Sequence, residues 1–356
     1  MKIHVICKRH YTNKDLLTDR FGRLYHLPVQ LAALGAQVSV SAMDYRSSVP
    51  ERLTVSDVRF RTEPASLLKL PSLLPRLRNA ARSSHPDVMI ASGDSHIGFL
   101  GLRLAKQMGV PFAFDVYDYY PAFSGNRIPG MKTMFRSATI NADLTLCVSE
   151  ALRERLYPLT KQSLLIPNGV DPALFHAGDR LEARAKLGLD TSIPIIGFFG
   201  SMGPSKGPIL LDACRMLHRE TPELRLLVAG RVKDVAIDFP WVTYFGEVSQ
   251  AAIPQLIAAC DVVAVPLAHH PQNDVSGSCK IAEYLACGRP VVATRVSNHE
   301  ELFRDAPGSI CEPNANSMAE ALRRQLDTPE IARLPKGMTW KAIAQTLHRE
   351  LLALGG

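Results

Sequence analysis

The sequence predicts an α/β protein made of two parallel-sheet domains, and three observations support this. Apolar, strand-like runs alternate with helical stretches along the whole chain, which is the pattern of βαβ units. The length of 356 residues exceeds what one hydrophobic core usually organises. A turn-rich segment, LIPNGVDPALF at residues 165–175, interrupts the alternation near its middle. We therefore expect two domains that are joined in this segment.

The strands expected in the first domain are short apolar runs, as buried parallel strands usually are. They are residues 2–7, 36–42, 86–92, 111–117 and 142–149, with a helix at 23–35 after the first. The second domain repeats the pattern, and its expected strands are residues 193–200, 224–230, 242–248, 261–266 and 290–294. Residues 62–87 form the one long segment that breaks the alternation.

Composition narrows the class of protein. Apolar residues at 46% and charged residues at 21% are ordinary for a soluble globular protein, and no apolar run approaches the roughly 18 residues of a membrane span. The amino terminus, MKIHVICKRH, carries an apolar run too short for a signal peptide and is interpreted as a strand. The seven cysteines lack both CxxC spacing and clustered histidines, so we expect reduced thiols and no metal site. We expect a cytoplasmic protein.

The charge is concentrated in the first half of the chain. Residues 1–165 hold 22 basic and 13 acidic residues, a net charge of +9, and the remainder carries −2. A basic half indicates an anionic partner such as a membrane surface, although a solvated basic face is the plainer interpretation. No nucleic-acid-binding motif accompanies the charge, so nucleic acid is not an expected partner.

A loop in the second half has the features of an anion site. In FFGSMGPSKGPILLDACRML, residues 198–217, a strand leads through Gly200 and a Pro-broken loop with Lys206 into a helix. The exposed amides and the dipole at the start of a helix favour an anion. The alternative is that the glycines only satisfy turn geometry. Neither a Walker A motif nor GxGxxG is present, which argues against an ATPase or a dehydrogenase.

A second stretch, SGSCKIAEYLACGRPVVAT at residues 276–294, also predicts a loop that opens into a helix and then a buried strand. If the helix begins near Ser278, Glu283 lies little more than a turn inside it, and its carboxylate could accept hydrogen bonds from a ribose diol. The alternative is a surface glutamate paired with Lys280, which would contribute only about 0.2–0.5 kcal/mol. Local sequence does not decide between the two.

The order of several motifs resembles the family 4 retaining glycosyltransferases of the GT-B fold. These motifs are VSEALRERL, IPNGVD, the lysine loop, LLVAG, VTYFGEVSQAAIPQLIAACDVVAVP, KIAEYLACGRPVVA and a closing MTWKAIAQTLHRELLAL. The resemblance implies two Rossmann-like domains that face a central cleft. It assigns an acceptor-binding domain to residues 1–165, a nucleotide-sugar donor domain to 166–335, and a helix that crosses back onto the first domain to 336–356.

The resemblance also implies roles for individual residues. Glu283 matches the glutamate that holds the ribose, and Lys206 matches the lysine on the diphosphate, where it also assists catalysis. The remaining donor-binding residues that we predict are Gly200, Ser201, Arg231, Ser276, Gly277, Ser278 and Lys280. No cofactor or metal is expected, because the lysine and the helix ends supply the positive charge.

The sequence departs from the family pattern at three places. The first of two family glutamates is replaced by Val275, with Asp274 beside it as a substitute. The arginine that often follows the strand glycine is Ser201, so Arg231 is expected to help Lys206. Where family members often carry a histidine near the sugar, this chain has FDVYDYYP, and Asp118 is the nearest candidate for a catalytic group. Asp118 could equally cap a turn.

The implied reaction transfers a sugar from a nucleotide-sugar to an acceptor with retention of configuration. The expected acceptor is a glycan or a polyprenyl-linked sugar in the synthesis of cell-surface polysaccharide or glycoconjugate. Two alternatives stay open at this point. One is a sugar-nucleotide epimerase of the same architecture, and the other is a non-catalytic sugar-nucleotide-binding or polyanion-binding protein, which the departures at Val275 and Ser201 make plausible.

The segment SLLKLPSLLPRLRNAAR, residues 66–82, predicts a membrane or acceptor contact at the inner face of the cell membrane. Leucines alternate there with Lys69, Arg76, Arg78 and Arg82, and we expect Pro71 and Pro75 to prevent one long helix. The leucines would enter the headgroup boundary while the cations bind an anionic leaflet. The alternative is that these leucines pack beneath the domain as part of an ordinary helix.

Overall fold

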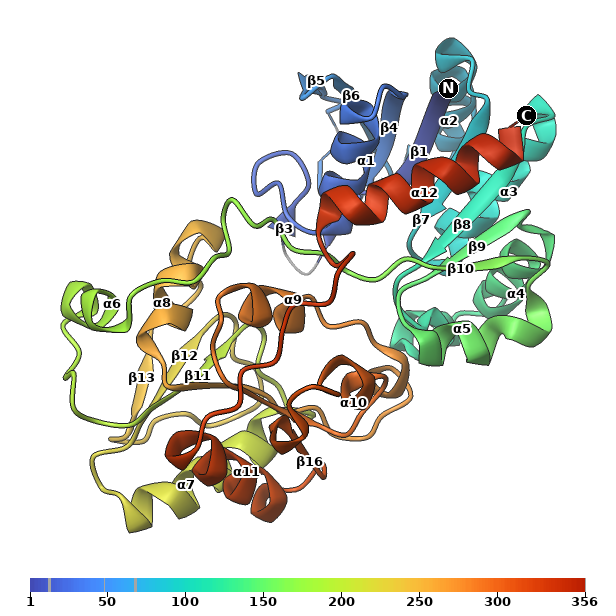
Figure 1. The fold of residues 1–356 in the computed structure, drawn as a ribbon. Coiled ribbons are helices and arrows are strands. Elements are labelled where there is room, and N and C mark those ends of the chain that lie inside the picture. Colours follow the sequence, from blue (N-terminus) through green and yellow to red (C-terminus); the bar gives the residue numbers. More distant parts are fainter. Residues whose placement is uncertain (12–13, 48, 67–68, 356) are drawn as a thin grey trace. The chain divides into compact units, whose positions relative to one another are not determined.

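The computed structural model describes residues 1–11, 14–47, 49–66 and 69–355. By its contacts the chain divides into two compact units, which are coloured along the sequence in Figure 1. Unit 1 comprises Met1–Gly169, Val275–Gly277 and Thr339–Gly356, and unit 2 comprises Val170–Asp274 and Ser278–Met338. The chain therefore passes from one unit to the other just after the turn-rich segment begins, and it returns to unit 1 before the last helix.

Unit 1 is built on an eight-stranded sheet with the order β10-β9-β8-β7-β1-β4-β6-β5. Neighbouring strands are parallel except β5 and β6, which form an antiparallel edge. The strands are β1 (Lys2–Lys8), β4 (Gln37–Asp44), β5 (Arg52–Val55), β6 (Val58–Pro64), β7 (Val88–Ser92), β8 (Phe112–Val116), β9 (Leu144–Cys147) and β10 (Ser163–Leu165). A separate small hairpin consists of β2 (His10–Tyr11) and β3 (Lys14–Asp15).

Helices cover the sheet of unit 1, as burial of both faces of a parallel sheet requires. They are α1 (Arg23–Ala33), α2 (Leu70–Ser84), α3 (Ser95–Met108), α4 (Met131–Asn141), α5 (Glu150–Leu156) and α12 (Trp340–Gly355), with 3₁₀ turns η2 (Tyr120–Ala122), η3 (Ser124–Arg127) and η4 (Tyr157–Leu159). The last helix, α12, packs against α1 (Figure 1). The Trp340 ring stacks on His26 with ring centroids 5.3 Å apart, and Ile343 and Leu347 are buried in the same core. The carboxy-terminal helix is thus part of unit 1.

Unit 2 has a six-stranded, wholly parallel sheet with the order β13-β12-β11-β14-β15-β16. Its strands are β11 (Ile195–Phe199), β12 (Arg225–Ala229), β13 (Val242–Tyr244), β14 (Val262–Val265), β15 (Val291–Thr294) and β16 (Ile310–Cys311). Its helices are α6 (Arg180–Leu187), α7 (Gly207–Glu220), α8 (Ile253–Ala259), α9 (Cys279–Ala286), α10 (His299–Leu302) and α11 (Ala315–Asp327), with 3₁₀ turns η5 (Gln250–Ala252), η6 (Asn273–Val275) and η7 (Pro307–Ser309). This strand order is the doubly wound order of Rossmann folds.

Local sequence explains where several of these elements begin and end. The side chain of Asp179 accepts a hydrogen bond of 2.7 Å from the amide of Glu182 and so caps the start of α6. The same helix ends at Gly188, whose φ of +65° suits glycine. Every residue of β7 and of β14 is buried, as their continuous apolar runs predict.

The expectation that two prolines prevent one long helix in the basic segment is wrong. Residues 70–84 form the single helix α2, with Pro71 in its first turn and Pro75 inside it. The amides of the first turn have no partner within a helix, so Pro71 costs nothing there. Pro75 costs about 3 kcal/mol, but Leu73 and Leu77 are buried in the core of unit 1, where each contributes about 1.5–3 kcal/mol.

The leucines of this segment that the structure describes therefore belong to the core, as the alternative interpretation has it. Leu74 also packs partly against this core. Leu67 and Leu68, two leucines of the segment for which membrane contact was predicted, lie outside the described residues, as does the side chain of Leu70. Of the four basic residues, Lys69 and Arg82 are exposed. The remaining two are half-buried, so fewer cations face solvent than the sequence suggested.

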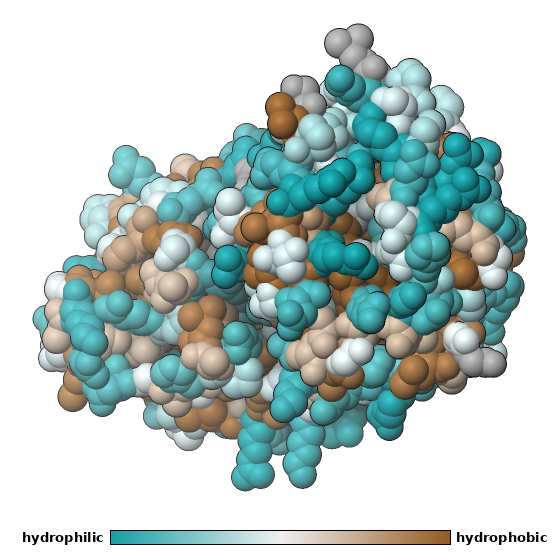
Figure 2. All heavy atoms as spheres, turned by 90° about the horizontal axis from the view of Figure 1, so that it is seen from above, coloured by the Kyte–Doolittle hydropathy of each residue, from teal (hydrophilic) through white to brown (hydrophobic). Residues whose placement is uncertain are grey.

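The cysteines are reduced thiols, as the sequence predicts. All seven cysteines are free, and six of them are buried, whereas Cys279 is half-buried. Among the residues that the structure describes, no helix combines the length and the apolarity that crossing a bilayer requires. On the face shown in Figure 2, hydrophobic residues stand in groups among hydrophilic ones.

Candidate functional site

Several of the predicted donor residues of unit 2 lie at the point in its sheet where the order of the strands reverses, between β11 and β14. After β11 the chain runs through α7 to β12, whereas after β14 it runs through α9 to β15, on the other side of β11. The loops that follow β11 and β14 therefore start side by side, and the amide of Ala268 donates to the carbonyl of Ser205 across them at 2.9 Å. Open α/β sheets bind ligands at such a switch point.

The loop after β11 carries Gly200, Ser201 and Lys206 to the start of α7. The amide of Met202 donates to the carbonyl of Arg231 at 2.9 Å, which ties this loop to the one after β12. Lys206 occupies the N-cap position of α7, and its Nζ lies 3.4 Å from the carbonyl oxygen of Ser201. The lysine ammonium and the positive end of the α7 dipole thus lie in the same region, which favours an anion.

Helix α9 is attached to the end of β11 through two of its side chains. The hydroxyl of Tyr284 accepts a hydrogen bond of 3.0 Å from the amide of Phe199. The Lys280 side chain lies directly over Gly200, with its Nζ 5.8 Å from the centre of the Phe198 ring. Lys280 is therefore positioned beside the loop that carries Lys206, and the structure brings Gly200, Ser201, Lys206 and Lys280 together.

Glu283 projects from the second turn of α9 and is half-buried. Burial raises the pKa of its carboxyl to about 7, although the positive charge of Lys280 and a hydrogen bond from the Gln250 side chain act in the opposite direction. Lys280 thus acts on Glu283 through its charge, but Glu283 is half-buried, so the two residues are not an ordinary surface ion pair. A carboxylate in this position can accept hydrogen bonds from hydroxyl groups of a ligand.

Three other residues predicted for donor or sugar binding, Asp274, Ser278 and Arg231, have different surroundings. Asp274 Oδ1 lies 2.8 Å from Nδ1 of His269, so a residue of the same loop contacts the Asp274 carboxylate. Ser278 is the N-cap of α9 and makes no side-chain cap hydrogen bond. Arg231 is exposed and joins the site through its backbone.

Ser276 and Gly277 belong by their contacts to unit 1. The side chain of Asn168 donates to the carbonyl of Gly277 at 2.6 Å, and the Ser149 hydroxyl donates to the carbonyl of Val275 at 2.7 Å. A β carbon at Gly277 would lie only 2.6 Å from a methyl group of Val148. The roles of Ser276 and Gly277 toward a donor therefore stay predictions.

Unit 1 has a polar cluster at its own switch point, between β1 and β7. Lys8, the last residue of β1, places its Nζ 3.1 Å from Asp94 Oδ1 in the turn after β7. His96, two residues later, lies with its Nε2 2.5 Å from the Tyr45 hydroxyl, and burial lowers the pKa of this imidazole. Asp118, just after β8, accepts a hydrogen bond from Tyr11.

Burial is the main reason why the pKa of Asp118 is raised, to about 6, and the charge of Asp94 adds to this rise. Lys8 and Arg23 act in the opposite direction. Asp118 is thus a group that can gain or lose a proton near neutral pH.

Sequence reasoning missed Lys8, Asp94 and His96. Their signal is that polar residues stand at the end of one buried strand and in the turn after another, and the sheet order places these two strands side by side. Recognising this required knowing that β1 and β7 are neighbours.

A buried ion pair, Arg23 with Asp115, lies near this cluster in unit 1. The guanidinium of Arg23 donates to both carboxylate oxygens of Asp115, at 2.6 and 3.1 Å, and the Ser92 hydroxyl donates to the same carboxylate at 2.8 Å. Arg23 also donates to the carbonyl of Ile166 at 3.1 Å. Removing one partner of such a pair leaves an uncompensated buried charge, so the loss of either Arg23 or Asp115 should be strongly destabilising.

Metal ligands are not grouped in the part of the chain that the structure describes: no cluster of three or more His, Cys, Asp or Glu residues there could hold a metal ion. The positive charge described in the unit 2 site comes from lysines and a helix start.

Comparison with known proteins gives the site its context. A model described as Glycosyltransferase Family 4 matches residues 23–174, and a model described as Glycosyl transferases group 1 matches residues 193–328. The chain belongs to the family 4 glycosyltransferases. Both halves of the chain carry the match, so the resemblance seen in the motifs is confirmed.

Curated relatives agree over part of their length. A D-inositol 3-phosphate glycosyltransferase of Stackebrandtia nassauensis is 32% identical over 210 residues, 51% of this chain and 46% of that protein. One of Saccharomonospora viridis is 30% identical over 236 residues, 56% of this chain and 53% of that protein. The match thus spans about half the length of these relatives.

Solved structures of known glycosyltransferase fold resemble the whole chain. Sucrose-phosphate synthase of Thermosynechococcus elongatus has a TM-score of 0.76 at 22% identity and covers 99% of each chain. Anabaena HepE in complex with UDP-glucose has a TM-score of 0.66 at 20% identity and covers 100% of this chain and 97% of that one. At this identity the likeness concerns the fold, which is of the GT-B type with two Rossmann-like units.

Proposed function

We propose that this protein transfers a sugar from a nucleotide-sugar donor to an acceptor hydroxyl. The observation that carries the proposal is the arrangement at the unit 2 switch point, where Lys206, Lys280 and the start of α7 surround one loop and Glu283 lies on the adjoining helix. Positive groups and a half-buried carboxylate in one place suit a ligand that has both a diphosphate and a ribose. The ligands of the Anabaena complexes, UDP and UDP-glucose, are of this class.

Each group in the donor site has a proposed task. The Glu283 carboxylate accepts hydrogen bonds from the ribose hydroxyls. Lys206, Lys280 and the α7 amides bind the diphosphate, with Arg231, Ser201 and the Ser278 end of α9 beside them. Because the leaving diphosphate gains negative charge as the glycosidic bond breaks, these cations stabilise the transition state more than the ground state.

The proposed reaction is retaining. The bond between the anomeric carbon and the diphosphate oxygen breaks, the acceptor oxygen forms its bond on the same face, and the acceptor proton passes to the departing phosphate. No side-chain nucleophile is needed, in contrast to glycosidases that use paired carboxylates. Magnesium is unnecessary if lysines balance the charge, and activity that persists in EDTA would support this. Loss of activity on chelation would contradict it.

The polar cluster of unit 1 is the proposed acceptor site. Asp118, with its pKa raised to about 6, assists the acceptor hydroxyl, and Lys8 and His96 orient the acceptor. Asp274 is held by His269 and is the proposed contact to the donor sugar. The proposed acceptor is a glycan or a polyprenyl-linked sugar at the cytoplasmic face of the membrane. A phosphorylated polyol is the second candidate, because the curated relatives are named for D-inositol 3-phosphate.

Two measurements test the proposal. In a thermal-shift screen against UDP-, GDP-, ADP- and dTDP-sugars, one donor at 100 times its dissociation constant should add about 2.7 kcal/mol of stability. Incubation with that donor and an acceptor glycan should then release the nucleoside diphosphate, and NMR of the glycoside formed should show the anomeric configuration of the donor. A donor that binds without ever being hydrolysed or transferred would favour a non-catalytic binding protein. A donor converted to a second nucleotide-sugar would favour an epimerase.

A further inference from the structure

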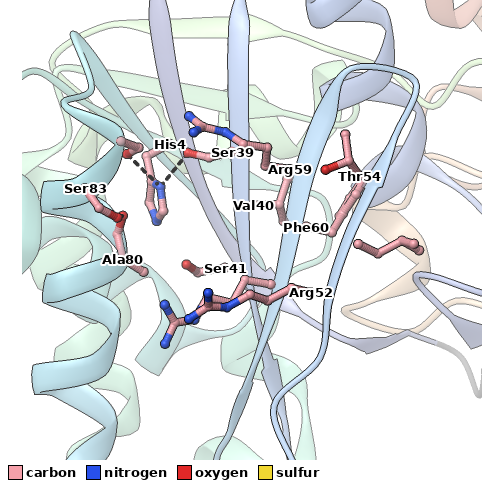
Figure 3. Close-up of a pocket in the computed structure, with 13 residues that line it drawn as sticks. His4, Ser39, Val40, Ser41, Arg52, Thr54, Arg59, Phe60, Ala80 and Ser83 are labelled. Atoms are coloured by element: carbon pink, nitrogen blue, oxygen red, sulfur yellow. Dashed lines mark hydrogen bonds between the residues drawn. The ribbon is translucent and has the colours of Figure 1, made fainter.

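Unit 1 contains a cavity of about 300 Å³ that the proposed glycosyl transfer does not use (Figure 3). It lies on the face of the sheet that α2 covers, between that helix and the strands β1, β4, β6 and β5. His4 faces it from the third position of β1, about 13 Å along the strand from Lys8 at the carboxyl end. The cavity is therefore away from the cluster at the strand ends.

The strand register places polar side chains in two rows across this cavity. His4, Ser39, Arg59 and Thr54 are paired successively across β1, β4, β6 and β5. Ser41, Arg61 and Arg52 form the next row on the same face. Helix-covered faces of parallel sheets are normally apolar, so a row of hydroxyl groups and arginines there needs an explanation.

Two of these side chains are almost fully buried and have a polar atom without a partner. His4 and Ser41 are each 1% exposed, and neither His4 Nε2 nor the Ser41 hydroxyl has a hydrogen-bond partner among the described residues. The other nitrogen of His4, Nδ1, is engaged by the hydroxyls of Ser39 at 2.8 Å and Ser84 at 3.2 Å. Leaving a buried polar group unpaired is unfavourable, and a ligand that bonds to it would remove this cost.

The charge around the cavity is positive. Arg52, Arg59 and Arg61 line it, and none of its described lining residues is acidic. Arg61 is paired with Glu63 at 2.5 Å, but no ion pair is formed by Arg52 or Arg59 with any residue that the structure describes. In Figure 3 these two arginines extend from the edge strands toward the side where His4 and Ser41 lie. Burial and the charge of Arg59 lower the pKa of His4 to about 4, so the imidazole is neutral at pH 7.

We propose that this cavity binds the phosphate group of a small phosphate ester. Arg59 and Arg52 would bind the phosphate oxygens, since guanidinium groups match phosphate geometry. His4 Nε2 and the Ser41 hydroxyl would complete its hydrogen bonds. The cavity has room for a sugar-sized group beside the phosphate.

The experiment uses the full chain and two soluble probes, inorganic phosphate and glucose 6-phosphate, in calorimetric titrations. We expect saturable binding with a Kd of about 1 mM or tighter. The double variant Arg52→Gln/Arg59→Gln should weaken it at least tenfold. Both arginines are exposed, so folding should persist. The control Arg136→Gln removes the same kind of exposed arginine from α4 and should bind like the wild type.

A second measurement does not depend on any variant and separates this cavity from other phosphate sites. The ring nitrogen resonances of His4, observed by ¹⁵N NMR on the wild type, should shift in proportion to saturation. Phosphate that binds equally well to the double variant, or that leaves the His4 resonances unchanged, would overturn the proposal.

A vesicle experiment distinguishes a free phosphate ester from the phosphate of a lipid headgroup. Vesicles of phosphatidylcholine with and without phosphatidic acid are compared in sedimentation. If the double variant loses binding to phosphatidic acid while neither soluble probe binds, the phosphate belongs to a lipid headgroup. Binding of the soluble probes assigns it to a free phosphate ester. Binding to neither source contradicts the proposal.

Discussion

The Lys280 side chain occupies the space that a β carbon would need at Gly200. The backbone of Gly200 has a φ of +140°, a conformation that side chains disfavour, and the Lys280 methylene groups lie where that β carbon would be. Glycine at this position therefore leaves room for the Lys280 side chain beside the loop that leads into α7. This arrangement connects the two segments that sequence motifs alone had placed in one site.

Replacing Gly200 with alanine should disturb both stability and donor binding. The strained backbone costs about 1–3 kcal/mol, and Lys280 must also move away from the β carbon. We expect a lower free energy of unfolding in urea and a weaker Kd for the nucleotide-sugar.

Gly188→Ala is a matched control for this change. Gly188 has a φ of +65° and nothing within 4 Å of an added β carbon, so it reports backbone strain alone. It should lose about 1 kcal/mol of stability and keep its donor affinity. Equal effects of the two substitutions on donor affinity would show that the contact with Lys280 is irrelevant to binding.

Glu283→Gln should raise stability and lower donor affinity at neutral and higher pH. Burial raises the pKa of Glu283 to about 7 from an ordinary value of 4.5. As pH rises from 4.5 to 7 the unfolded chain loses this proton first, so the wild type loses stability over that range. Above pH 7 the glutamine variant should be more stable by up to about 3 kcal/mol.

The donor affinity of the two proteins should diverge in the opposite sense. The ionised carboxylate accepts stronger hydrogen bonds from a ribose diol than an amide does, so wild-type affinity should increase as pH passes through 7 and the variant should show no such increase. Urea unfolding and calorimetric titration at several pH values measure both quantities. A variant that is less stable above pH 7, or that binds the donor with the wild-type pH dependence, would exclude this role of Glu283.

Local sequence was sufficient where one short stretch determines the structure. The apolar runs at β11, β14 and β15 predict buried strands, and the helix expected near Ser278 begins there as α9. The expected strand at residues 242–248 is shorter, Val242–Tyr244, and Gly246, two residues beyond its end, has a φ of +71° that does not continue a strand. Strand positions and helix starts depend mostly on neighbours in the sequence.

Features that depend on distant residues could not be derived in this way. The helix α2 continues through Pro75 because Leu73 and Leu77 find partners in a core that the sequence does not display. The Gln250 bond to Glu283 joins segments separated by a helix and a strand. Ser276 likewise follows its neighbours into unit 1, although its motif is continuous with α9.

Lys206→Ala should lower turnover more than donor affinity. The ammonium stands at the N-cap of α7, where positive charge opposes the charge that develops on the leaving diphosphate. Loss of one such group typically costs about 100-fold or more in turnover, whereas ground-state binding changes less.

Lys233→Ala is the control for Lys206, because Lys233 is an exposed lysine in a neighbouring loop and is paired with Asp234. Steady-state kinetics of both variants with the identified donor should give a reduced kcat only for Lys206→Ala. A change confined to KM, with kcat at the wild-type value, would limit Lys206 to ground-state binding.

Attachment to an anionic membrane, if it uses α2, should be purely electrostatic. Leu73 and Leu77 are buried in the core and cannot enter a bilayer, and Arg76 donates to Glu63 at 3.1 Å. Lys69 and Arg82 are exposed and Arg78 is half-buried, so we expect roughly 1 kcal/mol from each of the two exposed cations. Such binding is weak and is screened within about 10 Å at 0.1 M salt.

Sedimentation with phosphatidylglycerol vesicles tests this directly. We expect partial binding at low salt, none at high salt, and none to neutral phosphatidylcholine. Lys69→Glu/Arg82→Glu should abolish the low-salt binding, whereas Arg136→Glu, a charge reversal on α4, should weaken it less because that helix lies elsewhere in unit 1. If the α2 variant binds as well as the wild type, or if high salt leaves binding intact, then α2 is not the membrane contact, and the basic character of the amino-terminal half serves another anion.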